Sequence, residues 1–201
     1  QTFEAVNLAT LQAPKAAYQM LNSDKEESQL AMLSNLQLTK SMHFELIKYC
    51  QNKKIGFLSS AFDATSLEFL SKLNLEYFKI PSGEITNLPY LLEVGRHNHP
   101  IILSTGMSTL TEIRFALKTL VRAGTPKSKI IVLHCNTGYP TPLEDVNLLA
   151  ISGMRKSLKI EVGYSDHSVG IDVPVAAVAL GAVVIEKHIT LDKDMDGPDH
   201  L

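Results

Sequence analysis

Short apolar runs recur along the chain, separated by segments in which hydrophobic residues have helical spacing. Most of these runs are nearly continuous and rich in β-branched residues, which is typical of parallel strands buried on both faces. The predicted strands cover residues 55–59, 77–80, 101–104, 130–134, 160–164 and 183–186.

Three helices are predicted between the runs, over residues 66–73, 109–121 and 173–180. In the second helix, Thr109 and Glu112 have the spacing of a capping box, and Gly124 and Pro126 follow its last turn. The third helix is rich in alanine, which suits close packing on a sheet.

Residues 1–40 contain no clear strand. Residues 11–16 predict a long loop, and Ser23 with Glu26 predicts the start of a helix running to about Leu36. Because a connection of this length usually serves function, we interpret residues 1–40 as an active-site loop and helix.

Alternating strands and helices predict a parallel α/β sheet, either open and doubly wound or closed as a (β/α)₈ TIM barrel. The sequence has no glycine-rich nucleotide loop of the G-x-G-x-x-G or G-x-x-x-x-G-K-S/T kind. The usual reason to prefer the open sheet is therefore missing.

Polar residues gather where the predicted strands end. In a (β/α)₈ barrel these ends converge on the face that carries the catalytic site. A hydrogen-bonded strand terminus would explain any one such residue, but hardly six groups in register. The groups are Ser59, Ser60 and Asp63; Lys79, Ser82 and Glu84; Ser104 and Thr105; His134, Thr137 and Tyr139; Ser165, Asp166 and His167; and Glu186 and His188.

Two of these residues, His167 and His188, end consecutive strands and suit one metal ion. Two imidazoles with oxygen ligands favour Mn²⁺, Fe²⁺, Co²⁺ or Zn²⁺ over Mg²⁺, although a two-histidine pattern is a weak signal when it stands by itself. The two-residue period of a strand puts Glu186 and His188 on one face and Lys187 on the other. The other histidines considered, which lack a comparable setting, are His43, His97, His99 and His200; His97 and His99 have the character of solvated loop residues.

A cationic pocket lined by hydroxyl groups is predicted around Lys79, with Ser82, Ser104 and Thr105. Such a pocket suits a ligand with phosphate and carboxylate groups. Alternatively, Lys79 pairs with Glu84 or Glu186 for stability, and these glutamates are then counter-ions instead of acid/base residues.

Composition limits the class of protein. The 201 residues are 45% hydrophobic and 20% charged with a net charge of −2, as in an ordinary globular domain. No basic stripe favours nucleic acid or a membrane surface, and no apolar run is long enough to cross a bilayer. Cys50 and Cys135 lack the spacing of a disulfide framework or zinc site, so a cytoplasmic location is expected. Both ends of the chain look like cuts through a larger protein.

Six blocks of sequence resemble the sialic-acid (nonulosonate) synthases, a family that includes N-acetylneuraminate and N,N'-diacetyllegionaminate synthases. The blocks follow one another in family order and cover essentially the whole chain. They are residues 78–84, 102–107, 134–142, 163–167, 185–190 and 197–200.

The resemblance implies a TIM barrel followed by a small antifreeze-like domain that completes the partner's active site in a homodimer. Compared with that pattern, residues 41–201 correspond to βα units three to eight, about six of eight. The first strand with its catalytic glutamate, a lysine before Gln1 and everything after the eighth strand are absent. We therefore expect a polypeptide of only these residues to be inactive.

The resemblance also implies a reaction in which phosphoenolpyruvate condenses with an open-chain N-acetylated amino sugar. A divalent metal, Mn²⁺ foremost with Mg²⁺ or Co²⁺ as alternatives, is expected on His167 and His188, where it polarises the aldehyde. The third carbon of phosphoenolpyruvate attacks that aldehyde, water adds, and phosphate leaves by carbon–oxygen cleavage.

Roles for further residues follow from the same resemblance. Glu84 and Glu186 match catalytic carboxylates, and some family members have Asn where Thr137 stands. The expected substrate-binding residues are Lys79, Ser82, Ser104, Thr137 and Tyr139 for phosphoenolpyruvate, Gln1 and Asp199 for the sugar, and Ser60.

The resemblance leaves alternatives for the identity of the sugar substrate and for the enzyme class. Residues 13–16, 85–90 and 144–148 look more like N,N'-diacetyllegionaminate synthases than N-acetylneuraminate synthases. A synthase of the 3-deoxy-octulosonate type would need basic residues for a second phosphate, but the arginines considered, Arg96, Arg114, Arg122 and Arg155, fall in helical or loop segments. A catalytically degenerate barrel that serves as a binding module is the remaining alternative.

Overall fold

The computed structural model describes residues 1–15, 17–20, 27–195 and 199–200. The chain divides into two compact units, the first built from residues 1–76 and 190–201 and the second from residues 77–189. The second unit contains the sheet and most of the predicted site.

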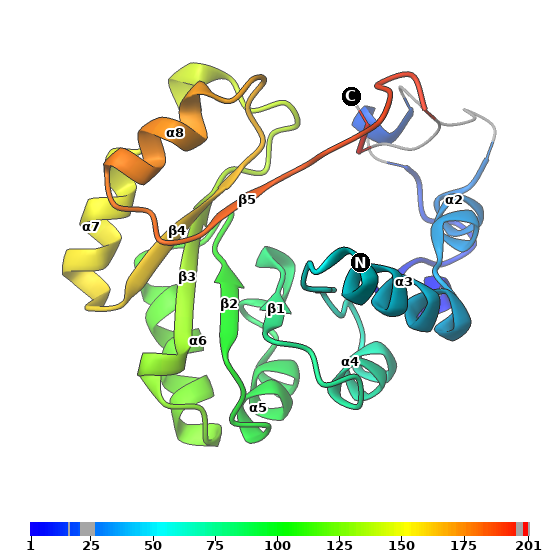
Figure 1. The fold of residues 1–201 in the computed structure, drawn as a ribbon, viewed down its shortest axis with the longest axis horizontal. Coiled ribbons are helices and arrows are strands. Elements are labelled where there is room, and N and C mark those ends of the chain that lie inside the picture. Colours follow the sequence, from blue (N-terminus) through cyan, green and yellow to red (C-terminus); the bar gives the residue numbers. More distant parts are fainter. Residues whose placement is uncertain (16, 21–26, 196–198, 201) are drawn as a thin grey trace. The chain divides into compact units, whose positions relative to one another are not determined.

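Five parallel strands form the sheet of the second unit, in the order β1-β2-β3-β4-β5 (Figure 1). Neighbouring strands are also consecutive in the chain, and every pair is parallel, as expected for repeated βα units. The strands are β1 (Phe78–Ile80), β2 (Ile101–Ser104), β3 (Ile130–Cys135), β4 (Glu161–Asp166) and β5 (Ile185–Lys187). Five of the six predicted runs are thus confirmed as strands.

Four helices line the outer side of this sheet in Figure 1. They are α5 (Leu88–Arg96), α6 (Leu110–Ala123), α7 (Leu149–Leu158) and α8 (Asp172–Ala179). The capping box of Thr109 and Glu112 is present at the start of α6, and Gly124 ends that helix with a φ of 138°. The short 3₁₀ helices of this unit are η2 (Ser82–Glu84), η3 (Lys127–Lys129) and η4 (Leu143–Asp145).

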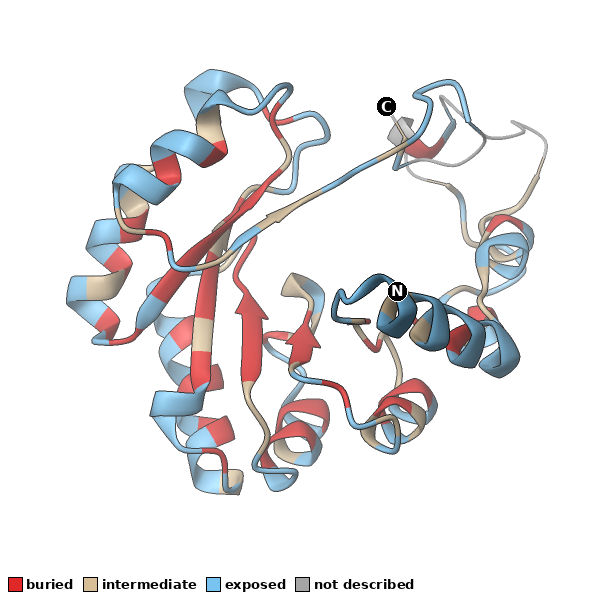
Figure 2. Cartoon of the chain, in the orientation of Figure 1, coloured by how far each residue is buried: buried red, intermediate tan, exposed pale blue. Residues whose placement is uncertain are grey.

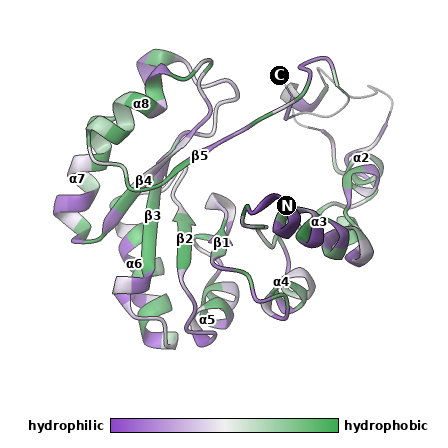
Figure 3. Ribbon diagram, viewed as in Figure 1, coloured by the Kyte–Doolittle hydropathy of each residue, from purple (hydrophilic) through white to green (hydrophobic). Residues whose placement is uncertain are grey.

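The core of the second unit lies between the sheet and these helices. Every residue of β1 and β2 is buried, and the strands are mostly hydrophobic (Figures 2 and 3). Because β1, β2 and β3 are mostly apolar on both faces, the helices can cover one face while much of the other remains out of solvent, whereas β5 is only partly buried. Lys79 is the charged exception within β1.

The first unit is helical, and here the sequence prediction needs two corrections. Residues 55–59 form no strand; the neighbouring Ala61 makes a single parallel bridge with Thr2. Ile55 and Leu58 are exposed, so this run lacks the burial that would favour a strand. The elements are α1 (Ala5–Leu8), η1 (Ala17–Met20), α2 (Gln29–Leu36), α3 (Lys40–Lys53) and α4 (Ala64–Ser71).

The second correction concerns the predicted helix that ends near Leu36. Its end is confirmed, but α2 begins at Gln29, and Ser28 caps it by accepting a hydrogen bond from the Ala31 amide. Ser23 and Glu26, the predicted capping residues, lie outside the described residues.

His43 of α3 is a buried core residue of the first unit. It is fully buried, and its ring bonds the Thr2 hydroxyl at 2.7 Å and the Thr39 carbonyl oxygen at 2.8 Å. The rings of Phe57 and Phe69 contact it edge-on. Within the described part of the chain, no helix is both long enough and apolar enough to cross a membrane.

Candidate functional site

Lys79 is the buried cation at the centre of the candidate site. It lies on β1 with 8% of its surface exposed. Its Nζ donates a hydrogen bond of 2.7 Å to the Ser104 hydroxyl on β2 and lies 3.4 Å from Oε2 of Glu186 on β5. A buried ammonium group needs such partners, and of the two alternative counter-ions, Glu84 and Glu186, the structure shows Glu186.

The contact between Lys79 and Glu186 shows how strongly the sheet curves. Strands β1 and β5 are its two edges, and in a flat sheet they would lie about 19 Å apart, four intervals of roughly 4.8 Å. Lysine and glutamate side chains cannot span that gap. The sheet is therefore a half-barrel, and Lys79 and Glu186 project from its edge strands into the concave side.

Glu186 is held by two donors. Ser165 of β4 donates a hydrogen bond of 2.7 Å to Oε1, while Oε2 faces Lys79. These two partners fix the position of both carboxylate oxygens. The Glu186 side chain keeps 40% of its surface exposed, so the carboxylate remains accessible from solvent.

A second cluster of residues lies on the loops that follow β1, β2 and β3 and consists of Ser82, Gly106 and Thr137. The Gly106 amide donates to the Ser82 hydroxyl oxygen at 2.8 Å. A Cβ atom at Gly106 would lie 2.7 Å from Cγ2 of Thr137 and 3.0 Å from the Ser82 oxygen. Only glycine therefore lets these loops approach so closely.

Thr105 does not line the pocket as the sequence predicted. It is buried, and its hydroxyl donates a 2.8 Å hydrogen bond to the backbone carbonyl of Leu133. That bond takes the only proton the hydroxyl has, so Thr105 joins β2 to β3 instead of offering a donor to a ligand.

His167 and His188 lie together, as the sequence predicted. Their ring centroids are 5.4 Å apart with the rings nearly perpendicular. The Tyr139 ring lies 4.2 Å from the His167 ring and 5.6 Å from that of His188. The three residues come from the loop after β3 and from the ends of β4 and β5.

The loop of residues 136–141 holds His167 in a defined orientation. Nδ1 of His167 lies 2.8 Å from the Asn136 carbonyl oxygen, and the Thr141 amide donates to the His167 carbonyl at 2.9 Å. A carbonyl oxygen can only accept, so Nδ1 carries the proton and Nε2 keeps its lone pair. Burial, reinforced by His188 and opposed by the bond to Asn136, lowers the pKa of His167 and favours the neutral ring.

These features fit a metal held by two histidines. Neutral His167 presents Nε2, and its Nδ1–H is bonded in the manner common for metal-binding histidines. Among the described residues, no cluster of three or more His, Cys, Asp or Glu side chains has the geometry to hold a metal ion.

A buried ion pair lies behind the two histidines. Lys187 of β5 donates a hydrogen bond of 2.5 Å to Oδ2 of Asp166, the last residue of β4. The Asp166 side chain is fully buried and also accepts bonds from the amide and hydroxyl of Ser168. Burial by itself would raise the pKa of Asp166, but these hydrogen bonds outweigh it and lower the pKa.

Four predicted site residues are not joined to this cluster by described contacts. Glu84 accepts a 2.6 Å hydrogen bond from the Asn87 side chain. Gln1, Ser60 and Asp199 belong to the first unit, whose placement relative to the second is not determined.

Sequence reasoning did not assign roles to Asn136, Asp166 or Lys187. The alternation of side chains along β5 correctly put Lys187 on the face opposite Glu186, but its partner lies 21 positions away in the sequence. The backbone carbonyl of Asn136 leaves no mark in a sequence pattern at all.

The whole chain is similar to one family of known proteins. The NeuB family model matches residues 1–201. The chain is 50% identical over 200 residues to the N,N'-diacetyllegionaminic acid synthase of Campylobacter jejuni and 42% identical over 203 residues to that of Legionella pneumophila. It covers all of its own length in both alignments, but 60% and 57% of those two proteins.

A solved structure extends the match to three dimensions. The N-acetylneuraminic acid synthetase of Leptospira borgpetersenii, in complex with citrate, matches with a TM-score of 0.84 at 31% identity, over 100% of this chain and 64% of that one. The chain thus spans about three fifths of the length of the curated relatives it matches. With one family model covering every residue, the chain belongs to the NeuB family.

Proposed function

We propose that the full-length protein is a nonulosonate synthase that condenses phosphoenolpyruvate with an open-chain N-acetylated amino sugar and releases phosphate. The convergence of Lys79, Glu186 and the His167–His188 pair at the carboxyl ends of parallel strands carries this proposal. The half-barrel would belong to a complete (β/α)₈ barrel in the full-length protein.

Phosphoenolpyruvate binding is assigned to the cationic end of the site. Lys79 supplies a buried positive charge, and its bond to Ser104 fixes the ammonium group in place. Ser82 accepts the Gly106 amide bond with its oxygen and lies 3.5 Å from Sγ of Cys135, and its hydroxyl is proposed to donate to a phosphate or carboxylate oxygen when the substrate binds. Tyr139 and Thr137 complete this set of residues.

Glu186 is assigned to acid/base chemistry. Lys79 and Ser165 hold its two oxygens in place, and the carboxylate accepts a proton from the water that adds to the second carbon of phosphoenolpyruvate. Glu84 is the second carboxylate in this role, and Gln1, Ser60 and Asp199 are proposed sugar contacts.

A divalent metal, Mn²⁺ before Mg²⁺ or Co²⁺, is assigned to His167 and His188. When bound there it supplies Lewis acidity toward the aldehyde oxygen of the sugar. The protein's own contribution is orientation, since the Asn136 carbonyl keeps Nε2 of His167 available. The family's homodimer and a cytoplasmic location are part of the same proposal.

The proposed sugar is the precursor of N,N'-diacetyllegionaminate, 2,4-diacetamido-2,4,6-trideoxymannose. The names of the two relatives compared, at 50% and 42% identity, support it over N-acetylmannosamine. A second phosphate on the substrate finds no support, because Arg96, Arg114, Arg122 and Arg155 all lie on the helices α5, α6 and α7. No separate observation favours a degenerate barrel.

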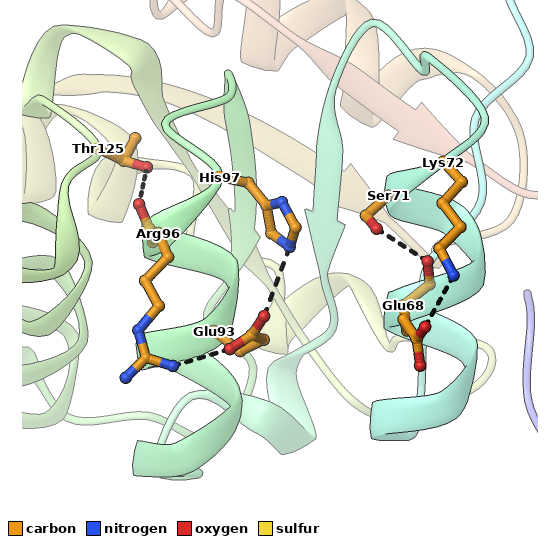
Figure 4. A network of polar contacts seen from close by, with 8 residues as sticks. Glu68, Ser71, Lys72, Glu93, Arg96, His97 and Thr125 are labelled. Carbon is orange, nitrogen blue, oxygen red and sulfur yellow. Dashed lines mark hydrogen bonds and ion pairs between the residues drawn. The ribbon is translucent and has the colours of Figure 1, made fainter.

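Phosphate release from phosphoenolpyruvate tests the proposal, with the full-length protein, Mn²⁺ and each sugar in parallel. His188→Ala should abolish sugar-dependent release. His97→Ala is the matched control, since His97 lies at the end of α5 and pairs with Glu93 instead (Figure 4). No release with either sugar would overturn the proposal, and release only with phosphorylated aldehydes would move it to the 3-deoxy-octulosonate type.

A further inference from the structure

Strands β4 and β5 end in three successive side-by-side pairs. Ser165 lies beside Glu186 and Asp166 beside Lys187 in the strand register, and His167 and His188 follow directly after them. The first pair is hydrogen-bonded at 2.7 Å, the second is an ion pair at 2.5 Å, and the rings of the third are 5.4 Å apart. Because side chains alternate along a strand, Asp166 and Lys187 face away from the two histidines.

Lys187 contacts the chain on both sides of His167. Its Nζ donates to the Asp166 carboxylate and, at 2.7 Å, to the backbone carbonyl of Ser168. The same Asp166 carboxylate accepts the Ser168 amide at 3.0 Å and the Ser168 hydroxyl at 2.7 Å. The residues before and after His167 are thus joined to one ammonium group, and that group belongs to the residue before His188.

We propose that Lys187 and Asp166 are positioning residues that fix the spacing of His167 and His188 from the opposite face of the sheet. The inference rests on the proposed role of those histidines as metal ligands. Neither residue touches substrate; each acts through the backbone that carries a histidine. Asp166 has a fully buried side chain and Lys187 a mostly buried one, so the pair is shielded from competing water.

The place where the strand pairing ends explains why the Lys187–Asp166 ion pair is needed. The pairing of β5 with β4 stops at Lys187, one residue before His188. His188 itself is exposed and lies beyond that last pair. Without the ion pair, the ends of the two strands would be free to move apart by more than a metal–nitrogen bond tolerates.

Mn²⁺ affinity of the full-length protein tests the inference, measured by the loss of the free-ion electron paramagnetic resonance signal without substrates. Lys187→Met should weaken binding about tenfold or more, in the range found for groups that orient metal ligands. Lys187→Arg, which keeps the charge and the donors, should recover most of the affinity. Lys72→Met is the matched control, because Lys72 forms an exposed ion pair with Glu68 (Figure 4).

Lys187→Met leaves the buried Asp166 carboxylate without its ion-pair partner and could prevent folding, so a second variant is needed. The double variant Asp166→Asn with Lys187→Met removes both charges and should fold while still binding Mn²⁺ more weakly. A merely structural pair would lower the unfolding temperature and leave the affinity of the folded protein unchanged. Affinities within twofold of wild type in a folded single or double variant would overturn the inference.

The proposed function and this inference fail in different ways. If the wild-type protein binds no Mn²⁺, both the inference and the metal assignment are overturned. If it binds Mn²⁺ and the variants bind equally well, only the inference is overturned, and the phosphate-release assay still decides the function.

Discussion

Ser104 and Thr105 are neighbours in the sequence, yet their hydroxyl groups serve opposite sides of the sheet. Ser104 accepts a hydrogen bond from Lys79 inside the half-barrel, and Thr105 donates to the Leu133 carbonyl within the buried core. The two-residue period of a strand separates a functional hydroxyl from a structural one at adjacent positions.

This difference predicts opposite consequences for two conservative variants. Thr105→Val leaves the Leu133 carbonyl without its donor and should lower the free energy of unfolding by about 1–3 kcal/mol, while kcat/KM changes little. Ser104→Ala should raise the KM for phosphoenolpyruvate and cost less stability than Thr105→Val, because Lys79 keeps its ion pair with Glu186. Urea unfolding and steady-state kinetics on both variants distinguish the roles; the reverse pattern would refute the assignment.

Lys79 is expected to contribute most of the binding energy for phosphoenolpyruvate. Lys79→Met keeps the length of the side chain but removes a charged donor worth roughly 1.5–3 kcal/mol, so kcat/KM should fall about 10- to 100-fold or more. The same substitution at Lys72, an exposed lysine on the end of α4, is the control. Unchanged kcat/KM in Lys79→Met would show that the cation serves only to neutralise Glu186.

Gly163 is predicted to be irreplaceable in β4. A Cβ atom there would lie 2.5 Å from the Val184 carbonyl oxygen and 2.6 Å from Cδ2 of Leu133. Gly163→Ala should therefore destabilise the protein by about 1–3 kcal/mol, as overpacking does.

Gly153 provides the matched control for that substitution. It lies inside α7 with open space around the position of its missing Cβ, so Gly153→Ala should stabilise the protein by roughly 0.5–1 kcal/mol. Urea midpoints measure both effects. Equal stability of Gly163→Ala and wild type would contradict the packing described for β3, β4 and β5.

Asp63 is expected to make stability depend on pH in the acid range. Burial favours a higher pKa, but hydrogen bonds from the Ser66 and Glu4 amides prevail and lower the pKa of Asp63 below 3.8. Its contribution is therefore complete above the unfolded pKa and is lost as pH falls through the lower folded pKa.

The Asp63→Asn variant tests this sign. Asparagine still caps α4 but does not titrate, so the variant's stability should fall less than that of wild type between pH 5 and pH 2. Glu45→Gln, at an exposed position on α3, controls for general charge effects. Parallel stability profiles for wild type and Asp63→Asn would contradict the prediction.

Much of the second unit could be predicted from the sequence because most of its strands are short apolar runs, and strands that pair in the sheet are consecutive in the chain. The run 101–104 became β2 without any change of boundary. The prediction of a strand at residues 55–59 was wrong. An apolar run forms a strand only where it pairs with another strand, and in the described part of the chain a single bridge, Thr2 with Ala61, forms nearby.

The sequence predicted which residues lie at the strand ends, but it did not predict which partner each of them contacts. Lys79 pairs with Glu186 instead of Glu84, a choice set by the curvature of the sheet across five strands. Thr105 and Ser104 look alike in the sequence, and their hydroxyl partners depend on which face each residue occupies. The placement of Gln1, Ser60 and Asp199 beside these residues stays a prediction.

The central claim is a condensation in which phosphate leaves by cleavage of the carbon–oxygen bond. The most direct test supplies the full-length protein with Mn²⁺, 2,4-diacetamido-2,4,6-trideoxymannose and phosphoenolpyruvate carrying ¹⁸O in the bridging position, and follows the phosphate by ³¹P NMR. We predict that phosphate forms only when the sugar is present and that it retains the ¹⁸O. Phosphate without ¹⁸O would mean that the bond to phosphorus is cleaved, and release that does not need the sugar would mean that phosphoenolpyruvate is simply hydrolysed; either result would contradict the proposed synthase.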